Sequence, residues 1–103
     1  SKNLIIKASF DVNLSSIGKK VSGIECFDMD NLESKIKEEN IKMIMLTVPD
    51  NVAQEIVDRI VNTNVKAILN FTPITLMVPK DIKVSNVDLS IELQTLSYYV
   101  SED

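Results

Sequence analysis

The sequence contains no histidine, a single cysteine and few aromatic residues among its 103 positions. Without histidine, the chain cannot build a histidine-dependent triad or use an imidazole as acid or base, and it lacks the commonest ligand of transition metals. The lone cysteine, Cys26, excludes an internal disulfide, which favours a reducing cytoplasm over a secreted environment. We therefore expect no catalytic residue and no metal site.

Positive charge and long apolar runs are also scarce. The formal net charge is −4, and the only adjacent basic pair is Lys19-Lys20, so the surface gives no support to direct binding of nucleic acid. The longest apolar runs fall far short of a bilayer span, which predicts no contact with a membrane. The chain is 45% hydrophobic, which suits an aliphatic core in one domain.

Apolar runs alternate with amphipathic segments along the chain. Strands are expected at Leu4 to Phe10, Ile24 to Phe27, Ile41 to Val48, Val65 to Phe71 and Ile82 to Val84. Helices are expected after an Asp30 cap and ending near Asn40, after Pro49-Asp50 with Val52, Ile56, Ile60 and Val61 facing inward, and from about Val87 to Val100. The segment from Asp11 to Gly23 is expected to be a loop. This alternation indicates an α/β fold with a parallel sheet and right-handed crossovers.

Two polar segments follow buried strands at the carboxyl edge of the expected sheet, where ligands of open α/β sheets bind. They are Thr47-Val48-Pro49 and Asn70-Phe71-Thr72-Pro73. A threonine hydroxyl and a helix N-terminus suit a pyrophosphate, although the first segment also suits a plain helix start. An amide and an aromatic ring suit the carboxamide and face of a planar ligand ring, although Phe71 equally suits a core position.

Asp11 ends the first expected strand. An acid at a strand end of dinucleotide-binding folds accepts hydrogen bonds from the adenosine ribose and repels the extra phosphate of NADP. A surface carboxylate opening a turn with Asn13 is the alternative. Two other patterns predict no site, because Gly18-Lys19-Lys20 lacks the rest of a phosphate-binding loop, and Asp28 with Asp30 lacks the glycine and distal glutamate of a calcium loop.

The order and spacing of five motifs are more specific than any one of them. The motifs are Phe10-Asp11-Val12, Ile17-Gly18-Lys19-Lys20, Leu46-Thr47-Val48-Pro49, Ile68-Leu69-Asn70-Phe71-Thr72-Pro73 and Asn86-Val87-Asp88-Leu89. Together, from about Phe10 to Tyr99, the chain resembles the C-terminal half of the Rex family of redox-sensing transcriptional repressors. That family has an N-terminal winged-helix domain, which binds DNA, followed by a Rossmann domain that binds NADH or NAD.

The resemblance implies a fold for the whole chain. Residues 1–103 would form a single partial Rossmann-like domain of the CoA-binding-domain type, with a mostly parallel sheet and flanking helices. The first strand-helix unit, with its glycine-rich phosphate loop, would be missing, as in a fragment. We expect the gap left by this central strand to be closed by direct pairing of the Leu4 and Met43 strands or by exchange with a second copy.

The resemblance also implies roles for single residues. Asp11 would bind the adenosine ribose, and Thr47, Val48 and Pro49 would lie beside the pyrophosphate and a ribose. Asn70, Phe71, Thr72 and Pro73 would lie near the nicotinamide, with Thr72 standing where the family commonly has alanine. Asp88 matches an acid of the polar network that distinguishes the two redox states. The last helix, about residues 87–100, resembles the helix that is exchanged between subunits, and its stripe comprises Leu89, Leu93, Leu96 and Val100.

The implied function is not enzymatic. The chain would be the NAD(H)-sensing and dimerisation portion of a cytoplasmic repressor that releases DNA when NADH binds. DNA would be bound only by the missing winged helix, the homodimer would form through the last helix, and NADH or NAD would bind this chain weakly or not at all.

Two other functional interpretations of the residues stay open. The first is the CoA-binding domain of an acyl-CoA ligase or of a small CoA-binding protein, against which Asp11 counts, because a carboxylate sits poorly near a ribose phosphate. The second is a piece of an NAD-dependent dehydrogenase, which would lack an evident proton donor beside Asn70 and Phe71.

Overall fold

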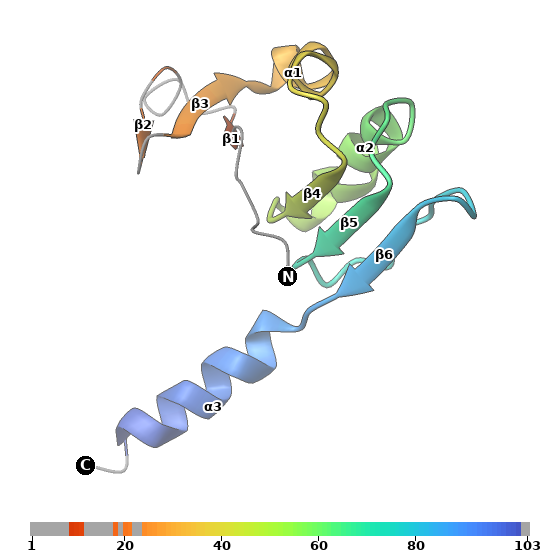
Figure 1. Ribbon diagram of the computed structural model, residues 1–103. Helices are drawn as coiled ribbons and strands as arrows, with labels where there is room; N and C mark the ends of the chain where they lie inside the picture. The colour runs from red at the N-terminus through yellow and green to blue at the C-terminus, as the bar shows by residue number, and fades with distance from the viewer. Residues whose placement is uncertain (1–8, 12–17, 19, 22–23, 102–103) are drawn as a thin grey trace, which may run out of the picture.

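The computed structural model describes residues 9–11, 18, 20–21 and 24–101 (Figure 1). Its elements are, in chain order, β1 (Ser9–Asp11), β2 (Lys20–Val21), β3 (Ile24–Asp28), the short 3-10 helix η1 (Met29–Asn31), α1 (Leu32–Glu38), β4 (Met43–Leu46), α2 (Asp50–Ile60), β5 (Ala67–Asn70), β6 (Lys83–Asn86) and α3 (Leu89–Ser101). The predicted α/β, Rossmann-like class is confirmed.

The strands form two three-stranded sheets. In the larger one the order is β4-β5-β6 and both pairings are parallel, as the alternation of strands and helices predicts. In the smaller one β3 is central, pairing in parallel with β1 and antiparallel with β2. The strand β2 corrects the expectation of a simple loop between Asp11 and Gly23.

The two sheets are separate. Among the described residues, β1 pairs with β3 and β4 pairs with β5, so the direct pairing expected between the first strand and the Met43 strand does not occur within this part of the chain. Residues 4–8 of that expected strand lie outside the described residues. No strand that the structure describes pairs with the other edge of β4, so within the described sheet β4 is an edge strand.

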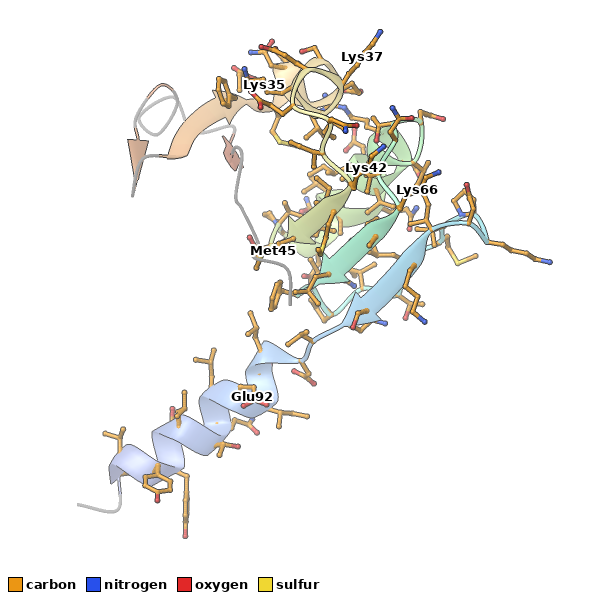
Figure 2. All side chains as sticks on the ribbon, in the orientation of Figure 1. Lys35, Lys37, Lys42, Met45, Lys66 and Glu92 are labelled. Carbon is orange, nitrogen blue, oxygen red and sulfur yellow. The ribbon has the colours of Figure 1, made fainter. Side chains whose placement is uncertain are left out.

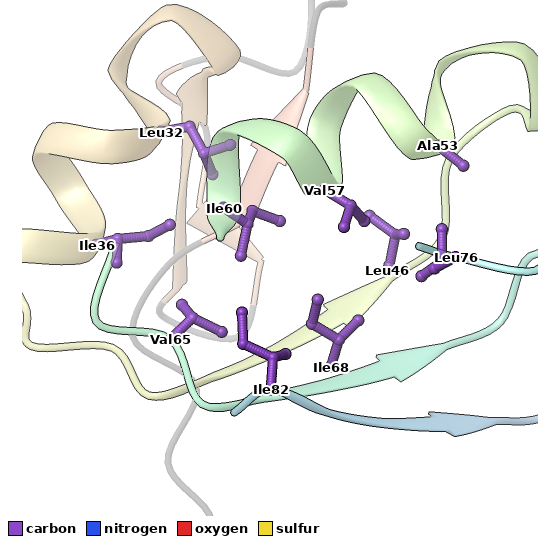
Figure 3. Packing of buried hydrophobic residues seen from close by; sticks show 10 residues of the cluster. All are labelled: Leu32, Ile36, Leu46, Ala53, Val57, Ile60, Val65, Ile68, Leu76 and Ile82. Carbon is purple, nitrogen blue, oxygen red and sulfur yellow. The ribbon is translucent and has the colours of Figure 1, made fainter. Parts of the chain in front are cut away.

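The core lies between the larger sheet and the two helices α1 and α2. Figure 3 shows side chains of α2 and of the strands pointing toward one another. The buried hydrophobic residues are Leu32, Ile36, Leu46, Ala53, Val57, Ile60, Val65, Ile68, Leu76 and Ile82. Burying one large aliphatic side chain contributes about 1.5–3 kcal/mol, so this cluster is the main source of stability in the described residues.

The inward face of α2 differs in part from the expected one. Ala53, Val57 and Ile60 are fully buried, whereas the expected Val52 and Ile56 are only half-buried beside them. The hydrophobic spacing gave the correct period and the correct Ile60, but the buried positions Ala53 and Val57 each lie one residue further along the chain than expected.

The face of β4 that points away from α2 is uncovered. Met43 and Met45 are 48% and 59% exposed, while Leu46 on the other face is buried (Figure 2). The expectation that this strand is buried therefore holds for the face of Leu46 and is wrong for the face of Met43 and Met45.

The start of α1 differs from the expected pattern, whereas its end does not. Asp28, not Asp30, caps the helical segment, since its Oδ1 accepts the backbone N–H of Asp30 at 2.9 Å. The helix ends as predicted near Asn40, which takes a left-handed φ of 52°. Such a residue permits the closing bond from the Ile41 N–H to the Ile36 carbonyl at 2.9 Å.

Helix α3 extends away from the larger sheet (Figure 1). All of its described side chains are exposed, including Leu93 at 62% and Leu96 at 61%. The expected helix is confirmed, but it packs against nothing that the structure describes.

Candidate functional site

A groove of about 460 Å³ lies where β5 and β6 end. Its walls are the turn after β5 and the connection from β6 into α3, comprising Phe71, Thr72, Pro73, Ile74, Thr75, Asn86, Val87, Asp88, Leu89 and Ser90. Asn70 and Asn86 are register partners at the last positions of two parallel strands, so the two segments leave the sheet side by side. This is the edge at which open α/β sheets bind ligands.

Asn70 is fully buried beneath the groove, and its amide group is used inside the protein. Its Nδ2 donates to the Ile74 carbonyl at 2.9 Å and to Asn86 Oδ1 at 3.0 Å. Its Oδ1 accepts the Thr72 backbone N–H at 3.0 Å and the Thr72 hydroxyl at 2.7 Å. Both donors and both acceptor positions are occupied, so Asn70 shapes the turn and has no hydrogen bond left for a ligand.

Thr72 lines the groove but turns its hydroxyl inward. The hydroxyl donates to Asn70 and accepts the backbone N–H of Ile74 at 3.3 Å, and the residue is only 7% exposed. Thr72 therefore adds a further bond within the turn and not a hydroxyl at the ligand. Phe71 is half-buried and Pro73 exposed, so these two residues supply the apolar part of this wall.

Asp88 caps α3 on the opposite wall. Its Oδ1 accepts the backbone N–H groups of Ser90 at 3.0 Å and Ile91 at 3.4 Å, which fixes the start of the helix beside the groove. The preceding Val87 N–H donates to the Asn70 carbonyl at 2.9 Å, extending the strand pairing one residue further. The structure thus brings together Phe71, Thr72, Pro73 and Asp88 of the predicted site.

The segment Thr47-Val48-Pro49 lies at the carboxyl end of the neighbouring strand β4 but does not line this groove. Pro49 is the N-cap of α2, and no side chain caps that helix. The Val52 N–H donates to the Pro49 carbonyl at 3.1 Å. Because no side chain caps the helix, the N–H groups of Asp50 and Asn51 keep the usual capacity of a helix start for an anion. Thr47 is exposed, and Val48 packs against the core.

Asp11 ends β1 opposite Asp28, its register partner at the end of β3. The backbone position agrees with the predicted strand end, and the Asp11 side chain lies outside what the structure describes.

Asn86 is the groove residue to which sequence reasoning gave no role. It belongs to the motif Asn86-Val87-Asp88-Leu89, yet its importance comes from its register with Asn70, sixteen residues earlier. Only the pairing of β5 with β6 reveals this contact.

No group of three or more potential metal ligands occurs within the described part of the chain. Among the same residues, no helix combines the length and the apolar character needed to cross a membrane.

Comparison with known proteins identifies relatives of this chain. The CoA binding domain model matches residues 1–74. The redox-sensing transcriptional repressor Rex of Lactobacillus acidophilus is 42% identical over 103 residues, which are 100% of this chain and 49% of that protein. Rex of Bacillus subtilis is 43% identical over 100 residues, covering 97% of this chain and 46% of that protein. The chain therefore spans about half the length of the curated relatives it matches.

Solved structures agree with these sequence relatives. The crystal structure of RSP in complex with β-NADH is 40% identical with a TM-score of 0.80, covering 93% of this chain and 47% of that chain. RSP, a Rex-family repressor, in complex with β-NAD⁺ and operator DNA is 40% identical with a TM-score of 0.79, covering 93% of this chain and 44% of that chain. The chain belongs to the CoA binding domain family, and within it its relatives are the Rex redox-sensing repressors.

Proposed function

We propose that the chain is the NAD(H)-sensing and dimerisation portion of a redox-responsive repressor that releases DNA when NADH binds. The observation that carries the proposal is the groove at the ends of β5 and β6, in a chain 40% identical to a repressor crystallised with β-NADH. The relatives are transcriptional repressors, which supports a regulatory and not an enzymatic role, and a cytoplasmic location follows from that role.

The nicotinamide half of the cofactor would occupy this groove. Phe71 and Pro73 offer an apolar wall to a flat ring, and Asp88 places a carboxylate across from them. Asn70 would act from below, by holding the turn and Asn86 in place. The nicotinamide ring carries a positive charge in NAD⁺ and none in NADH. The Asp88 carboxylate would respond most strongly to this difference, because an anion attracts a nearby cation.

The phosphate half would lie toward β4 and β1. The uncapped start of α2 after Thr47-Val48-Pro49 suits a phosphate, since free backbone N–H groups and the helix dipole favour anions. Asp11 at the end of β1 would accept hydrogen bonds from the adenosine ribose. A glycine-rich phosphate loop does not occur in the sequence, so we propose that this chain alone binds NADH weakly or not at all.

A homodimer would form through α3. Its exposed apolar side chains include Leu89, Ile91, Leu93, Leu96 and Val100. An unpartnered apolar surface of this extent on one helix marks an interaction site. DNA would be bound by a separate winged-helix domain in the longer protein, as the operator complex of RSP suggests for a relative.

A CoA-binding module is the second candidate, because the CoA binding domain model matches residues 1–74. The two functions differ in the nucleotide that binds. Isothermal titration of the longer protein that contains this sequence separates them: we expect NADH to bind and CoA to give no heat of binding. Binding of CoA with no binding of NADH would contradict the proposal.

A further inference from the structure

We propose that the side chain of Asn86 is a hydrogen-bond donor to the ligand of the groove, so that the groove selects a ligand with an acceptor oxygen at this position. In a nicotinamide cofactor this acceptor is the carboxamide oxygen. The identity of the ligand rests on the proposed function, whereas the polarity of Asn86 follows from the hydrogen bonds of the turn.

The orientation of the Asn70 amide is set by two backbone groups of fixed polarity. The Thr72 N–H can only donate, and it lies 3.0 Å from Asn70 Oδ1. The Ile74 carbonyl can only accept, and it lies 2.9 Å from Asn70 Nδ2. Exchanging the oxygen and nitrogen of Asn70 would set donor against donor and acceptor against acceptor, so one orientation is allowed.

The orientation of Asn86 follows from that of Asn70. The second hydrogen of Asn70 Nδ2 points at the Asn86 amide, 3.0 Å away, and only an acceptor can meet it. Asn86 must therefore turn Oδ1 toward Asn70. Its NH₂ group is left on the side away from Asn70, on an exposed residue that lines the groove.

Other polar side chains of the groove do not supply a fixed donor. The Thr72 hydroxyl is committed to Asn70, and the Asp88 carboxylate is an acceptor that caps α3. Thr75 and Ser90 are exposed hydroxyls, which rotate to donate or accept. The NH₂ of Asn86 is thus the donor whose direction the fold itself determines.

The variant N86D tests this polarity in the longer protein that carries the chain. A carboxylate oxygen still accepts from Asn70, but the group facing the groove becomes an acceptor. We expect the Kd for NADH to rise at least about tenfold, because the substitution removes one hydrogen bond and leaves an acceptor facing an acceptor. The Tm of the protein should not change. The matched control is S85D, which adds the same charge one residue earlier on the other face of β6; we expect a change below about threefold.

A cofactor analogue tests the same polarity without any substitution. Reduced 3-acetylpyridine adenine dinucleotide keeps the carbonyl oxygen but has no amide N–H, so it should bind the wild-type protein within about threefold of NADH. The inference is overturned if N86D binds NADH as tightly as the wild type does, or if S85D loses as much affinity as N86D. It is also overturned if the analogue binds the wild-type protein tenfold more weakly than NADH. Failure of the wild-type protein to bind NADH at all would instead contradict the proposed function.

Discussion

Asn70 and Asn86, the last residues of β5 and β6, are register partners whose side-chain amides are joined by a 3.0 Å hydrogen bond. One of the two is fully buried and the other lines the groove. The bond therefore connects the turn after β5 to a side chain that lines the groove. A strand-end motif that looks like a binding motif in the sequence is, at Asn70, a structural support for its neighbours.

Replacing Asn70 by alanine should destabilise the chain strongly. The substitution leaves the Thr72 N–H and the Ile74 carbonyl without their partner in a buried place. We expect the free energy of unfolding, measured by urea denaturation, to fall by about 2–4 kcal/mol. The control N86A alters the exposed end of the same bond, where water replaces the lost group, and should cost less than about 1 kcal/mol. Equal losses would show that burial of Asn70 is not the cause.

The ion pair between Glu33 and Arg59 joins α1 to α2 and should make stability depend on pH. Arg59 Nε donates to Glu33 Oε2 at 2.9 Å, and an NH₂ group of Arg59 also donates to the Met29 carbonyl at 2.6 Å. The hydrogen bond from Arg59 holds the pKa of Glu33 below its ordinary value of 4.5, while desolvation opposes this. A lowered folded-state pKa means that stabilisation is complete above the unfolded value and is lost as the pH falls through the folded value.

The variant E33Q tests this dependence. Because the pair is partly exposed, we expect a loss of about 0.5–1 kcal/mol at pH 7, measured by urea denaturation. The difference from wild type should shrink as the pH falls below 4.5. The control E38Q removes a more exposed partner on the same helix, which is 3.3 Å from Lys35, and should have little effect. A loss in E33Q that does not change with pH would contradict the electrostatic account.

A charge on the apolar face of α3 should break the proposed homodimer. Leu93 is 62% exposed in the single chain and lies on the stripe with Leu96. Burying a glutamate in its place forfeits the leucine contact and adds a desolvation cost, so we expect L93E to weaken association by about 3 kcal/mol, or about a hundredfold. Sedimentation equilibrium measures this change. The control Q94E places the same charge on the next residue. A wild-type chain that stays monomeric would contradict the assignment of α3 as the dimer interface, and so would an L93E dimer of unchanged affinity.

The isolated 103-residue chain should bind NADH weakly or not at all. It has the groove that we propose for the nicotinamide but no glycine-rich loop, the usual binding site of the pyrophosphate in dinucleotide-binding folds. Isothermal titration of the chain with NADH is the measurement, and micromolar affinity or better would contradict the expectation.

The sequence was sufficient to predict the parallel pairing of β4 with β5, because both are apolar runs of strand length next to helical segments. It was also sufficient for the end of α1 near Asn40 and for the presence of the last helix, α3. The burial of β4 was predicted wrongly, since Met43 and Met45 are apolar whether or not anything covers them. An apolar pattern records which face can be buried, and it does not record what covers that face.

The candidate site was predictable in position but not in the roles of its amides. The motif from Asn70 to Pro73 and the acid Asp88 do meet at one groove. The side chain of Asn70 makes all of its hydrogen bonds inside the protein because of the conformation of the turn after β5. The role of Asn86 depends on its register with Asn70, which lies sixteen residues earlier in the chain. Neither can be read from local spacing.

We propose that this chain senses NADH for a DNA-binding repressor. The direct measurement is fluorescence anisotropy of labelled operator DNA bound to the longer protein that contains the chain, titrated with NADH and separately with NAD⁺. The account predicts that NADH releases the DNA and that NAD⁺ at the same concentration leaves it bound. Retention of the DNA at saturating NADH would contradict the account.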